Sequence, residues 1–488
     1  MATLGQPSKP VTLPGSLPLS EPCREEPPHK DTTAPDTQTT QASKHSISDN
    51  PWDIIVRYPP HPPDSEELKW WENIAPLMGR LLQVAHYPLS EQYQHLLFLR
   101  NQLVPLLGPY PHQYHSLLTV TGHPFEASLN LQGAGAAATV RLTMEPLGRM
   151  TGPNRDRFRQ VGVAQICAQI AGLGLQGFDL ELHRHITAHL TLSGEEERRL
   201  TRDDHAFDAV SVQATHCMGF DFLPAGASAV KGYFFLGVRW KLAPAALGAT
   251  LLQCLEQIPA RCHVESLEAM RPAVEYMEAG QHFNDYTFLG WDYTDPAAAR
   301  VKLYGVCGGN PSLETAEEIW TIGGRLQAEP WCPKGLELLR RLWKYLEEDE
   351  ETETCSCGRP LASTRDAADQ EQRGSHRQIC LARKLLALAW NYEVQPGRST
   401  ALPKLYLSVH RKNDLFVARA LARFFRSLGW EDRARTYVED LQYVFAHEDL
   451  SQSTRVHNIV SLAYTEEKGA YVSMYYHSCL EYGSALVE

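Results

Sequence analysis

The chain of 488 residues lacks several features that would place it in a common class of protein. No apolar run approaches the ~20 residues that a helix needs to cross a bilayer. The opening stretch, MATLGQPSKPVTLPGSLP, has no basic segment followed by an apolar one, so we do not expect a secretory signal. The net charge is −12, and the sequence contains no block of Lys and Arg. Both features disfavour nucleic acids and anionic membranes as partners.

The cysteines do not show the pattern of a disulfide framework. The 11 cysteines are an odd number and are scattered along a large chain, so we interpret them as reduced thiols of a cytoplasmic protein. Hydrophobic residues make up 43% of the chain, which is enough to bury a sizeable core.

The first 50 residues differ in composition from the rest. They are rich in Pro, Ser, Thr and Gln and contain almost no aromatic or β-branched apolar clusters. Such a segment cannot bury enough apolar surface to fold, so we predict a disordered tail over residues 1–50. We expect residues 51–488 to form a single domain.

From residue 51 onward, helical and strand-like patterns alternate in pairs. The strand-like segments come as adjacent couples, which favours antiparallel pairing over βαβ units. Repeated helix–strand–strand–helix units can close a sheet into a barrel with the helices outside. The expected helices are Glu66–Val84, Glu91–Leu107, Arg155–Leu173, Gly194–Leu200, Pro244–Glu256, Val264–Gly280, Leu313–Ile322, Leu336–Glu347, Asp414–Leu428 and Glu431–Val444. The expected strands are Pro124–Leu131, Ala138–Glu145, Gln213–Phe222, Ala229–Gly237, Tyr286–Tyr293, Arg300–Val306, Leu386–Gln395, Lys404–Val409, Val456–Tyr464 and Ala470–Tyr476.

Several of these strands carry cations and phenol rings on one face. Side chains on a strand alternate between faces with a period of two, so residues two apart share a face. If these faces line one barrel, they form a shaft of positive charge and tyrosine. The sets are Lys231, Tyr233 and Phe235; Arg300, Lys302 and Tyr304; Lys404 and Tyr406; and Tyr471 with Tyr475.

Such a shaft suits the ionisation of an allylic diphosphate. Lys and Arg neutralise the diphosphate, and tyrosine faces stabilise a nearby carbocation by up to ~2 kcal/mol each when water is excluded. The alternative for any single strand is an amphipathic surface strand whose lysine reaches solvent. Three cationic strands with the same Lys–x–Tyr ending favour the lumenal interpretation.

From residue 51 to its end, the chain resembles the fungal aromatic prenyltransferases of the dimethylallyl-tryptophan synthase type. This resemblance implies a ten-stranded antiparallel barrel ringed by helices and built from αββα units. It also implies transfer of a dimethylallyl group from dimethylallyl diphosphate to an indole in alkaloid secondary metabolism, with no cofactor required. The order and spacing of the motifs carry it: Gln102–Pro111 (QLVPLLGPYP), Pro124–Asn130 (PFEASLN), Gly177–Leu180 (GFDL), Lys231–Tyr233 (KGY), Arg300–Tyr304 (RVKLY), Leu402–Tyr406 (LPKLY) and Gly469–Tyr476 (GAYVSMYY).

The resemblance assigns roles to residues of this sequence. Glu126 matches the carboxylate that binds the indole N–H, which raises electron density on the ring as the cation attacks. Leu117 and Leu118 match residues that pack near the aromatic acceptor. The diphosphate ligands correspond to Arg141, Lys231, Arg300, Lys302 and Lys404, and the tyrosine shield corresponds to Tyr233, Tyr304, Tyr406, Tyr471 and Tyr475.

The sequence also departs from the family pattern. Lys404 stands where the family often has Gln, and Phe235 stands where it often has Tyr. The last diphosphate arginine of the family has no match near Glu466–Lys468. Members that alkylate free tryptophan at C4 use a lysine upstream of the Lys–x–Tyr strand, and residues 201–230 contain none. We therefore expect a tryptophan-containing cyclic dipeptide or related indole as acceptor, and a monomer or homodimer as the assembly.

Two other functions remain open at this point. A tyrosine or another phenol would serve as acceptor with the same chemistry. A non-catalytic barrel that binds an anionic lipid is the more distant alternative, and such a binder needs no carboxylate at the position of Glu126.

Four further motifs are interpreted as structural. Asp203, Asp204 and Asp208 form one acidic cluster without a second, which is typical of a solvated turn. Cys355 and Cys357 lack a second pair at zinc spacing. His183 and His185 fall on a predicted strand or turn, and two histidines alone make no metal site. The segment GVCGG at 305–309 has no Lys-Ser/Thr after it and is no phosphate loop.

Overall fold

The chain divides into two compact units, Met1–Ile47 and Ser48–Glu488, and the description below concerns the second. The predicted tail, apart from Asn50, lies outside the described residues, as do Asp203, Asp204, Asp208, Cys355 and Cys357. The computed structural model describes residues 50–58, 62, 64–111, 116–119, 121–147, 151, 155–202, 215–243, 246–258, 267–280, 285–308, 311–347 and 387–477.

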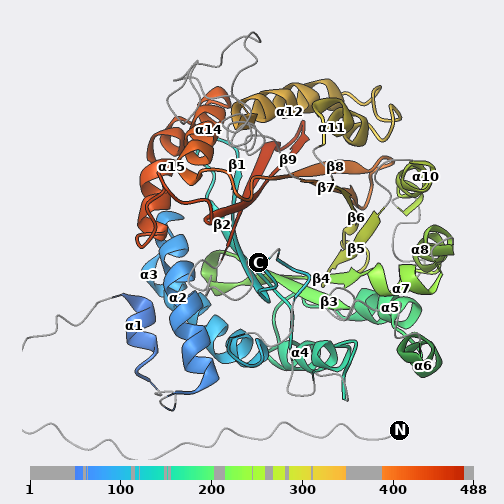
Figure 1. The fold of residues 1–488 in the computed structure, drawn as a ribbon, viewed down its shortest axis with the longest axis horizontal. Helices are drawn as coiled ribbons and strands as arrows, with labels where there is room; N and C mark the ends of the chain where they lie inside the picture. Colours follow the sequence, from blue (N-terminus) through green and yellow to red (C-terminus); the bar gives the residue numbers. More distant parts are fainter. Residues whose placement is uncertain are drawn as a thin grey trace, which may run out of the picture. The chain divides into compact units, whose positions relative to one another are not determined.

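Ten antiparallel strands form a closed barrel, which confirms the predicted fold (Figure 1). Each strand pairs with its neighbours in the chain, and β1 pairs with β10 to close the sheet. The strands are β1 (Phe125–Gln132), β2 (Thr139–Met144), β3 (His216–Phe222), β4 (Ser228–Phe235), β5 (Asp285–Asp292), β6 (Val301–Gly308), β7 (Ala387–Val394), β8 (Leu402–Ser408), β9 (His457–Thr465) and β10 (Gly469–Tyr476).

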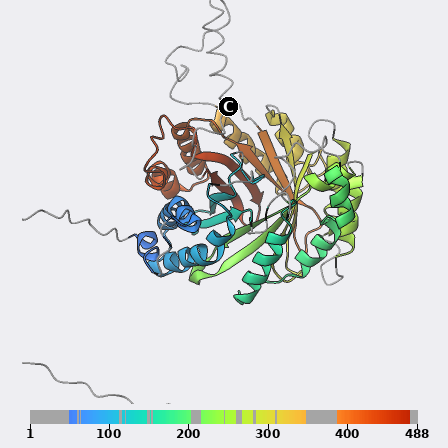
Figure 2. The ribbon, with the colours of Figure 1, turned by 60° about the horizontal axis from the view of Figure 1, so that its bottom comes forward.

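Helices surround the barrel, as Figures 1 and 2 show from two directions. Strand couples alternate with helices along the chain, as the αββα expectation requires. The α-helices are α1 (Pro51–Ile55), α2 (Glu66–Val84), α3 (Leu89–Phe98), α4 (Val161–Gly172), α5 (Glu181–Leu190), α6 (Gly194–Arg202), α7 (Gly237–Leu242), α8 (Leu247–Glu256), α10 (Arg271–Ala279), α11 (Leu313–Trp320), α12 (Cys332–Glu347), α14 (Asp414–Ser427) and α15 (Glu431–Val444).

The hydrophobic core lies between the barrel wall and the helices. In α14, apolar residues at helical spacing are fully buried, whereas Asn413 caps the helix by accepting a hydrogen bond from the Phe416 N–H at 3.0 Å. Strand residues alternate, so one set meets the helices and the other faces the lumen. On the outer side of β4, Gly232 leaves room for the indole of Trp291, since a Cβ there would lie 2.5 Å from the ring.

Several expected segments differ in the structure, among them Arg155–Leu173, where α4 begins only at Val161. The segment with His183 and His185 is helix α5, not a strand or turn, because Leu182, Ile186 and Leu190 repeat every four residues and pack inward. The helix expected over Glu91–Leu107 is α-helical only to Phe98. It continues as a π turn, Leu99–Leu103, and a 3₁₀ turn, Val104–Leu106, where Pro105 lacks a backbone donor. Helix α8 begins at Leu247, and Pro244 lies outside the described residues.

Among the described residues, none of the helices is both long and apolar enough to cross a membrane.

Candidate active site

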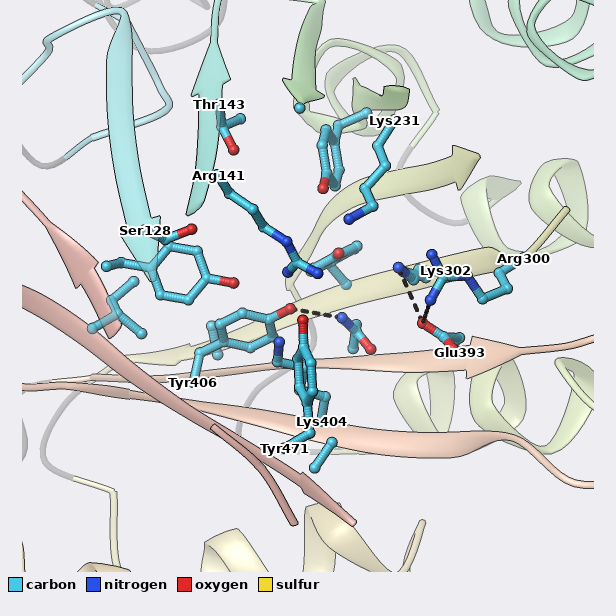
Figure 3. Close-up of a pocket in the computed structure, with 18 of the residues that line it drawn as sticks. Ser128, Arg141, Thr143, Lys231, Arg300, Lys302, Glu393, Lys404, Tyr406 and Tyr471 are labelled. Carbon is cyan, nitrogen blue, oxygen red and sulfur yellow. Dashed lines mark hydrogen bonds and ion pairs between the residues drawn. The ribbon is translucent and has the colours of Figure 1, made fainter. Parts of the chain in front are cut away.

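A cavity of about 510 Å³ occupies the barrel lumen. All the predicted site residues except Leu117 line it, so the lumenal interpretation of the Lys–x–Tyr strands is correct and the surface alternative is wrong. Figure 3 shows Arg141 and Lys231 reaching into the same space as Tyr406 and Tyr471. The volume lies within the range of ordinary small-molecule sites.

Strand register brings the cations together and gives each a carboxylate. Arg141 on β2 lies opposite Asp221 on β3, and the Arg141 Nε is 2.7 Å from Asp221 Oδ1. The Lys231 Nζ donates a hydrogen bond to Asp221 Oδ2 at 2.5 Å. One carboxylate therefore holds two cations side by side at the lumenal face.

A second group of charges lies on β5, β6 and β7. Arg300 binds Asp292 through two nitrogens, at 2.6 and 3.0 Å, and Lys302 Nζ lies 3.0 Å from Glu393 Oε2. Arg300 is also 3.7 Å from Glu393, so this carboxylate bridges both cations (Figure 3). Arg300 is about one third exposed, and we therefore assign its ion pairs little stability of their own.

The close packing of these charged groups shifts their pKa values. Burial alone would raise the pKa of Asp221, but Arg141 and Lys231 outweigh it and hold that pKa well below its usual range. The pKa of Glu393 is likewise low, because Lys302 and Arg300 outweigh its burial. Burial and the adjacent Arg141 lower the pKa of Lys231 to about 7, although Asp221 opposes the shift. The crowding of cations therefore favours loss of a proton from Lys231.

Lys404 completes the cationic layer from β8. Its Nζ donates a hydrogen bond to Ser473 Oγ at 3.1 Å and lies 4.6 Å from the ring centroid of Tyr471. Burial first, and then repulsion from Arg141, lower its pKa well below the usual range. With all five predicted cations charged against Asp221, Asp292 and Glu393, this layer would carry a net charge of +2, which suits an anion of high charge.

Tyrosine rings form an arc beside the cations. The centroids of Tyr233 and Tyr304 are 6.0 Å apart, those of Tyr304 and Tyr406 are 6.0 Å apart, and those of Tyr406 and Tyr475 are 5.9 Å apart. Asn391 donates a hydrogen bond to Tyr406 Oη at 2.8 Å. Burial raises the pKa of Tyr304, Tyr406 and Tyr475, so the arc stays neutral.

Glu126 lies on β1 opposite Thr143, two residues beyond the position where Arg141 pairs. With a rise of about 3.3 Å per residue, it is one layer, ~7 Å, farther along the barrel than Arg141. The Asn458 amide donates a hydrogen bond to Glu126 Oε1 at 3.0 Å. Burial raises the pKa of Glu126 to about 8, against the lowering effect of Asn458, so the carboxyl is mainly the neutral acid at pH 7.

The Glu126 end of the cavity is apolar and aromatic. Cys217 and Phe235 form a small buried cluster, and Leu117, Leu118, Tyr233 and Phe288 pack against it. Leu118 lines the cavity, whereas Leu117 supports the cluster without lining it. The cavity is therefore polarised, with cations in one layer and a carboxylate among apolar side chains in another.

Sequence reasoning missed five polar residues around this cavity. Asp221, Asp292 and Glu393 are recognisable only once strand register places them against Arg and Lys. Asn458 meets Glu126 across 332 residues of chain, a contact that no local pattern reveals. Lys468 lines the cavity from the turn before β10. It lies in the segment Glu466–Lys468, where the sequence has no match to the last diphosphate arginine of the family. The GVCGG segment belongs in part to β6 and takes no part in a phosphate loop.

The fold and cavity define a class of protein: an antiparallel barrel that encloses a cationic layer, an aromatic arc and a buried carboxylate. Comparison with known proteins narrows this class to one family. Residues 66–440 match the tryptophan dimethylallyltransferase family. The chain is 33% identical to deoxybrevianamide E synthase notF of Aspergillus sp. (strain MF297-2), over 91% of this chain and 94% of the relative. It is 31% identical to tryptophan dimethylallyltransferase nptA of Emericella nidulans, over 88% and 94% respectively.

Solved structures agree with the sequence matches. The crystal structure of NotF prenyltransferase superposes with a TM-score of 0.76 at 32% identity, covering 88% of this chain and 99% of that one. A second structure, NotF in complex with brevianamide F and DMSPP, gives a TM-score of 0.75. The chain belongs to the tryptophan dimethylallyltransferase family of indole prenyltransferases, and it is an enzyme.

Proposed function

We propose that this enzyme transfers the dimethylallyl group of dimethylallyl diphosphate to the indole of a tryptophan-containing cyclic dipeptide or a related tryptophan derivative, in alkaloid biosynthesis. The observation that carries the proposal is the order of three layers in one cavity. Cations occupy the first layer, tyrosine rings border it, and Glu126 lies one strand layer beyond Arg141. A diphosphate, an allylic cation and an indole would fit these layers in that order.

The cationic layer would hold the donor. Arg141, Lys231, Arg300, Lys302 and Lys404 would share the diphosphate oxygens, with the guanidinium groups able to bind them bidentately. The bond between the allylic carbon and oxygen then breaks, and its electron pair leaves with the diphosphate. Stabilising this departing charge by preorganised cations is the largest contribution that we assign to the protein.

The tyrosine arc would protect the cation formed in this step. The faces of Tyr233, Tyr304, Tyr406, Tyr471 and Tyr475 offer cation–π attraction of up to ~2 kcal/mol each in a dry site. The rings also keep water from the cation, which would otherwise be captured as an alcohol.

Glu126 would position the acceptor. With one oxygen held by Asn458 at 3.0 Å, the other can accept the indole N–H once the carboxyl is ionised. The negative charge raises electron density on the ring, which attacks the allylic carbon. One ring proton is exchanged for the prenyl group, and diphosphate is released.

Lys and Arg would do here what magnesium does for other diphosphate enzymes. Within the described part of the chain, each of the carboxylates of the cationic layer, Asp221, Asp292 and Glu393, is engaged by Lys or Arg. These carboxylates therefore serve to hold cations, and we propose that the reaction requires no metal or other cofactor.

The relatives support the choice of acceptor. One is named deoxybrevianamide E synthase, and its family neighbour NotF was solved with brevianamide F and DMSPP. Residues 201–230 contain no lysine, which argues against binding of free tryptophan in the way of the members that alkylate it at C4. Another relative is named tryptophan dimethylallyltransferase, so free tryptophan remains the direct competitor in the test.

We further propose that the enzyme works in the reducing environment of the cytoplasm. The described cysteines Cys167, Cys217, Cys254, Cys307 and Cys332 are free thiols in buried positions. Such thiols persist in a reducing compartment.

The test is a turnover assay in EDTA with dimethylallyl diphosphate and a panel of acceptors. The panel contains brevianamide F, other tryptophan-containing cyclic dipeptides, free tryptophan and tyrosine, and products are detected by mass. We expect prenylated indoles, with the highest kcat/KM for a cyclic dipeptide. A tenfold higher kcat/KM for free tryptophan, about 1.4 kcal/mol, would reverse the acceptor, and activity restored only by magnesium would contradict the metal-free mechanism.

A further inference from the structure

A cluster of metal-binding side chains lies outside the barrel, away from the lumen. His185 and His189 on α5 and Cys254 on α8 each offer a ligand atom, and these atoms all lie within 4.8 Å of one another. Among the described residues, this is the one group of three or more His, Cys, Asp or Glu side chains close enough to share an ion. It takes no part in the chemistry proposed above.

The two histidines lie on one face of their helix. A spacing of four residues places side chains one above the other on an α-helix, and zinc enzymes use this His-x₃-His arrangement. His185 and His189 are both partly exposed, and their ring centroids are 4.4 Å apart. Leu182 and Ile186, each three residues before one of these histidines, are buried against the core next to them. Helices α5 and α8 lie side by side outside the barrel (Figure 1), and both histidines contact residues at the end of α8.

Backbone carbonyls orient both rings. The Nε2 of His185 lies 2.7 Å from the Cys254 carbonyl oxygen, and the Nδ1 of His189 lies 2.8 Å from the His185 carbonyl oxygen. A carbonyl accepts only, so the facing nitrogen carries the proton in each ring. In the neutral rings this leaves His185 Nδ1 and His189 Nε2 with the lone pairs, as in metal sites whose second ring nitrogen is held by a carbonyl.

The third ligand comes from the neighbouring helix. Cys254 is fully buried and is a free thiol. His189 Nε2 lies 2.8 Å from Oε1 of Gln257, which follows α8. Two oxygens therefore flank the His189 ring, and a neutral ring can donate a proton to only one of them. A metal ion at Nε2 would take the place of the Gln257 oxygen.

We propose that His185, His189 and Cys254 form a zinc site that ties α5 to α8. Two imidazoles and one thiolate are a ligand set that Zn²⁺ prefers, with a water in the fourth, tetrahedral position. A maximum separation of 4.8 Å requires only small ring rotations to reach bond lengths of about 2.0–2.3 Å. The ion would join α5 to α8 and would take no part in the lumenal chemistry, because none of its three ligands lines the cavity.

The test measures binding of Zn²⁺ and Co²⁺ alone to the full-length, metal-stripped enzyme. We expect one Zn²⁺ per chain by competition with a chelating dye, a higher Tm with Zn²⁺, and a thiolate-to-Co²⁺ charge-transfer band in the near ultraviolet. His189→Ala should weaken Zn²⁺ binding at least tenfold, and Cys254→Ser should remove the band. His447→Ala, which changes an exposed histidine elsewhere, serves as the matched control.

Two outcomes would overturn the proposal: unchanged Zn²⁺ affinity in His189→Ala, or a Co²⁺ complex without the thiolate band. If Cys254→Ser does not fold, His185→Ala replaces it, with the band intensity and Zn²⁺ affinity as readouts. Prenyl transfer in EDTA is measured in parallel. We expect the His189→Ala enzyme to retain turnover, so failure of the zinc site and failure of the proposed function give different results.

Discussion

Donor binding should take up a proton at Lys231, and this is the most direct test of the cationic layer. Burial and Arg141 hold the pKa of Lys231 at about 7 before a diphosphate binds. A diphosphate beside it favours the charged form, so its pKa rises on binding. The part of the diphosphate affinity that depends on the Lys231 charge is therefore fully present below pH 7. It is lost as the pH rises above 7.

The magnitude follows from the protonated fraction. This fraction falls from about one half at pH 7 to about one hundredth at pH 9, so affinity should fall roughly fifty-fold, about 2.3 kcal/mol. Lys404, whose pKa is also lowered by burial, adds to the loss. The ligand of choice is the unreactive dimethylallyl thiolodiphosphate, because phosphate groups complete their ionisation near pH 6.

Calorimetry supplies the assay. Kd is measured from pH 6.5 to 9, and titrations at pH 8 in buffers of different ionisation enthalpy count the protons taken up. In Lys231→Arg the guanidinium stays charged over this range, so the slope of log Kd against pH should decrease by about one. A flat wild-type profile, or the same slope in Lys231→Arg, would refute the reasoning.

Four further predictions concern the catalytic carboxylate, the N-terminal segment and the barrel wall. Glu126→Ala should fold normally by circular dichroism and lose on the order of 10²–10³ in kcat, and near-normal kinetics would remove Glu126 from the mechanism. Since burial raises the pKa of Glu126 to about 8, its ionised form is lost as pH falls, and wild-type kcat/KM should drop about tenfold per pH unit below 8. Deleting residues 1–45 should leave kcat/KM unchanged within about twofold, as expected if residues 51–488 are the complete catalytic domain, and a large loss in the truncated protein would contradict this. Gly232→Ala should lower the free energy of unfolding by about 1–3 kcal/mol through contact with Trp291, whereas Gly172→Ala, which adds a methyl group in open space, should not.

Much of the site could be predicted because strand alternation is local. Lys231 with Tyr233, and Lys404 with Tyr406, share faces whatever the rest of the fold does, so their common lumen required only that the sheet close. The pairing of those cations with Asp221 and Glu393 could not be predicted in this way. It depends on the register between strands, and a shift of one residue would turn each carboxylate to the other face.

Helix α5 is the opposite case, because its sequence contains both a helical pattern of apolar residues and a pattern typical of a strand or turn. Leu182, Ile186 and Leu190 repeat at helical spacing, yet His183 and His185 two residues apart were interpreted as a strand or turn. The helix also brings His185 and His189 together, which a strand would have kept far apart.

The order of the strands has a consequence for synthesis of the enzyme. Since neighbours in the sheet are neighbours in the chain, the wall can assemble progressively from β1 as the chain leaves the ribosome. Only the seam between β1 and β10 must wait, together with the bond from Asn458 to Glu126 across 332 residues. Until then both seam edges expose unpaired backbone groups, and a nascent or truncated chain is both inactive and open to strand exchange with its neighbours. Catalytic competence thus arrives only with the last strand.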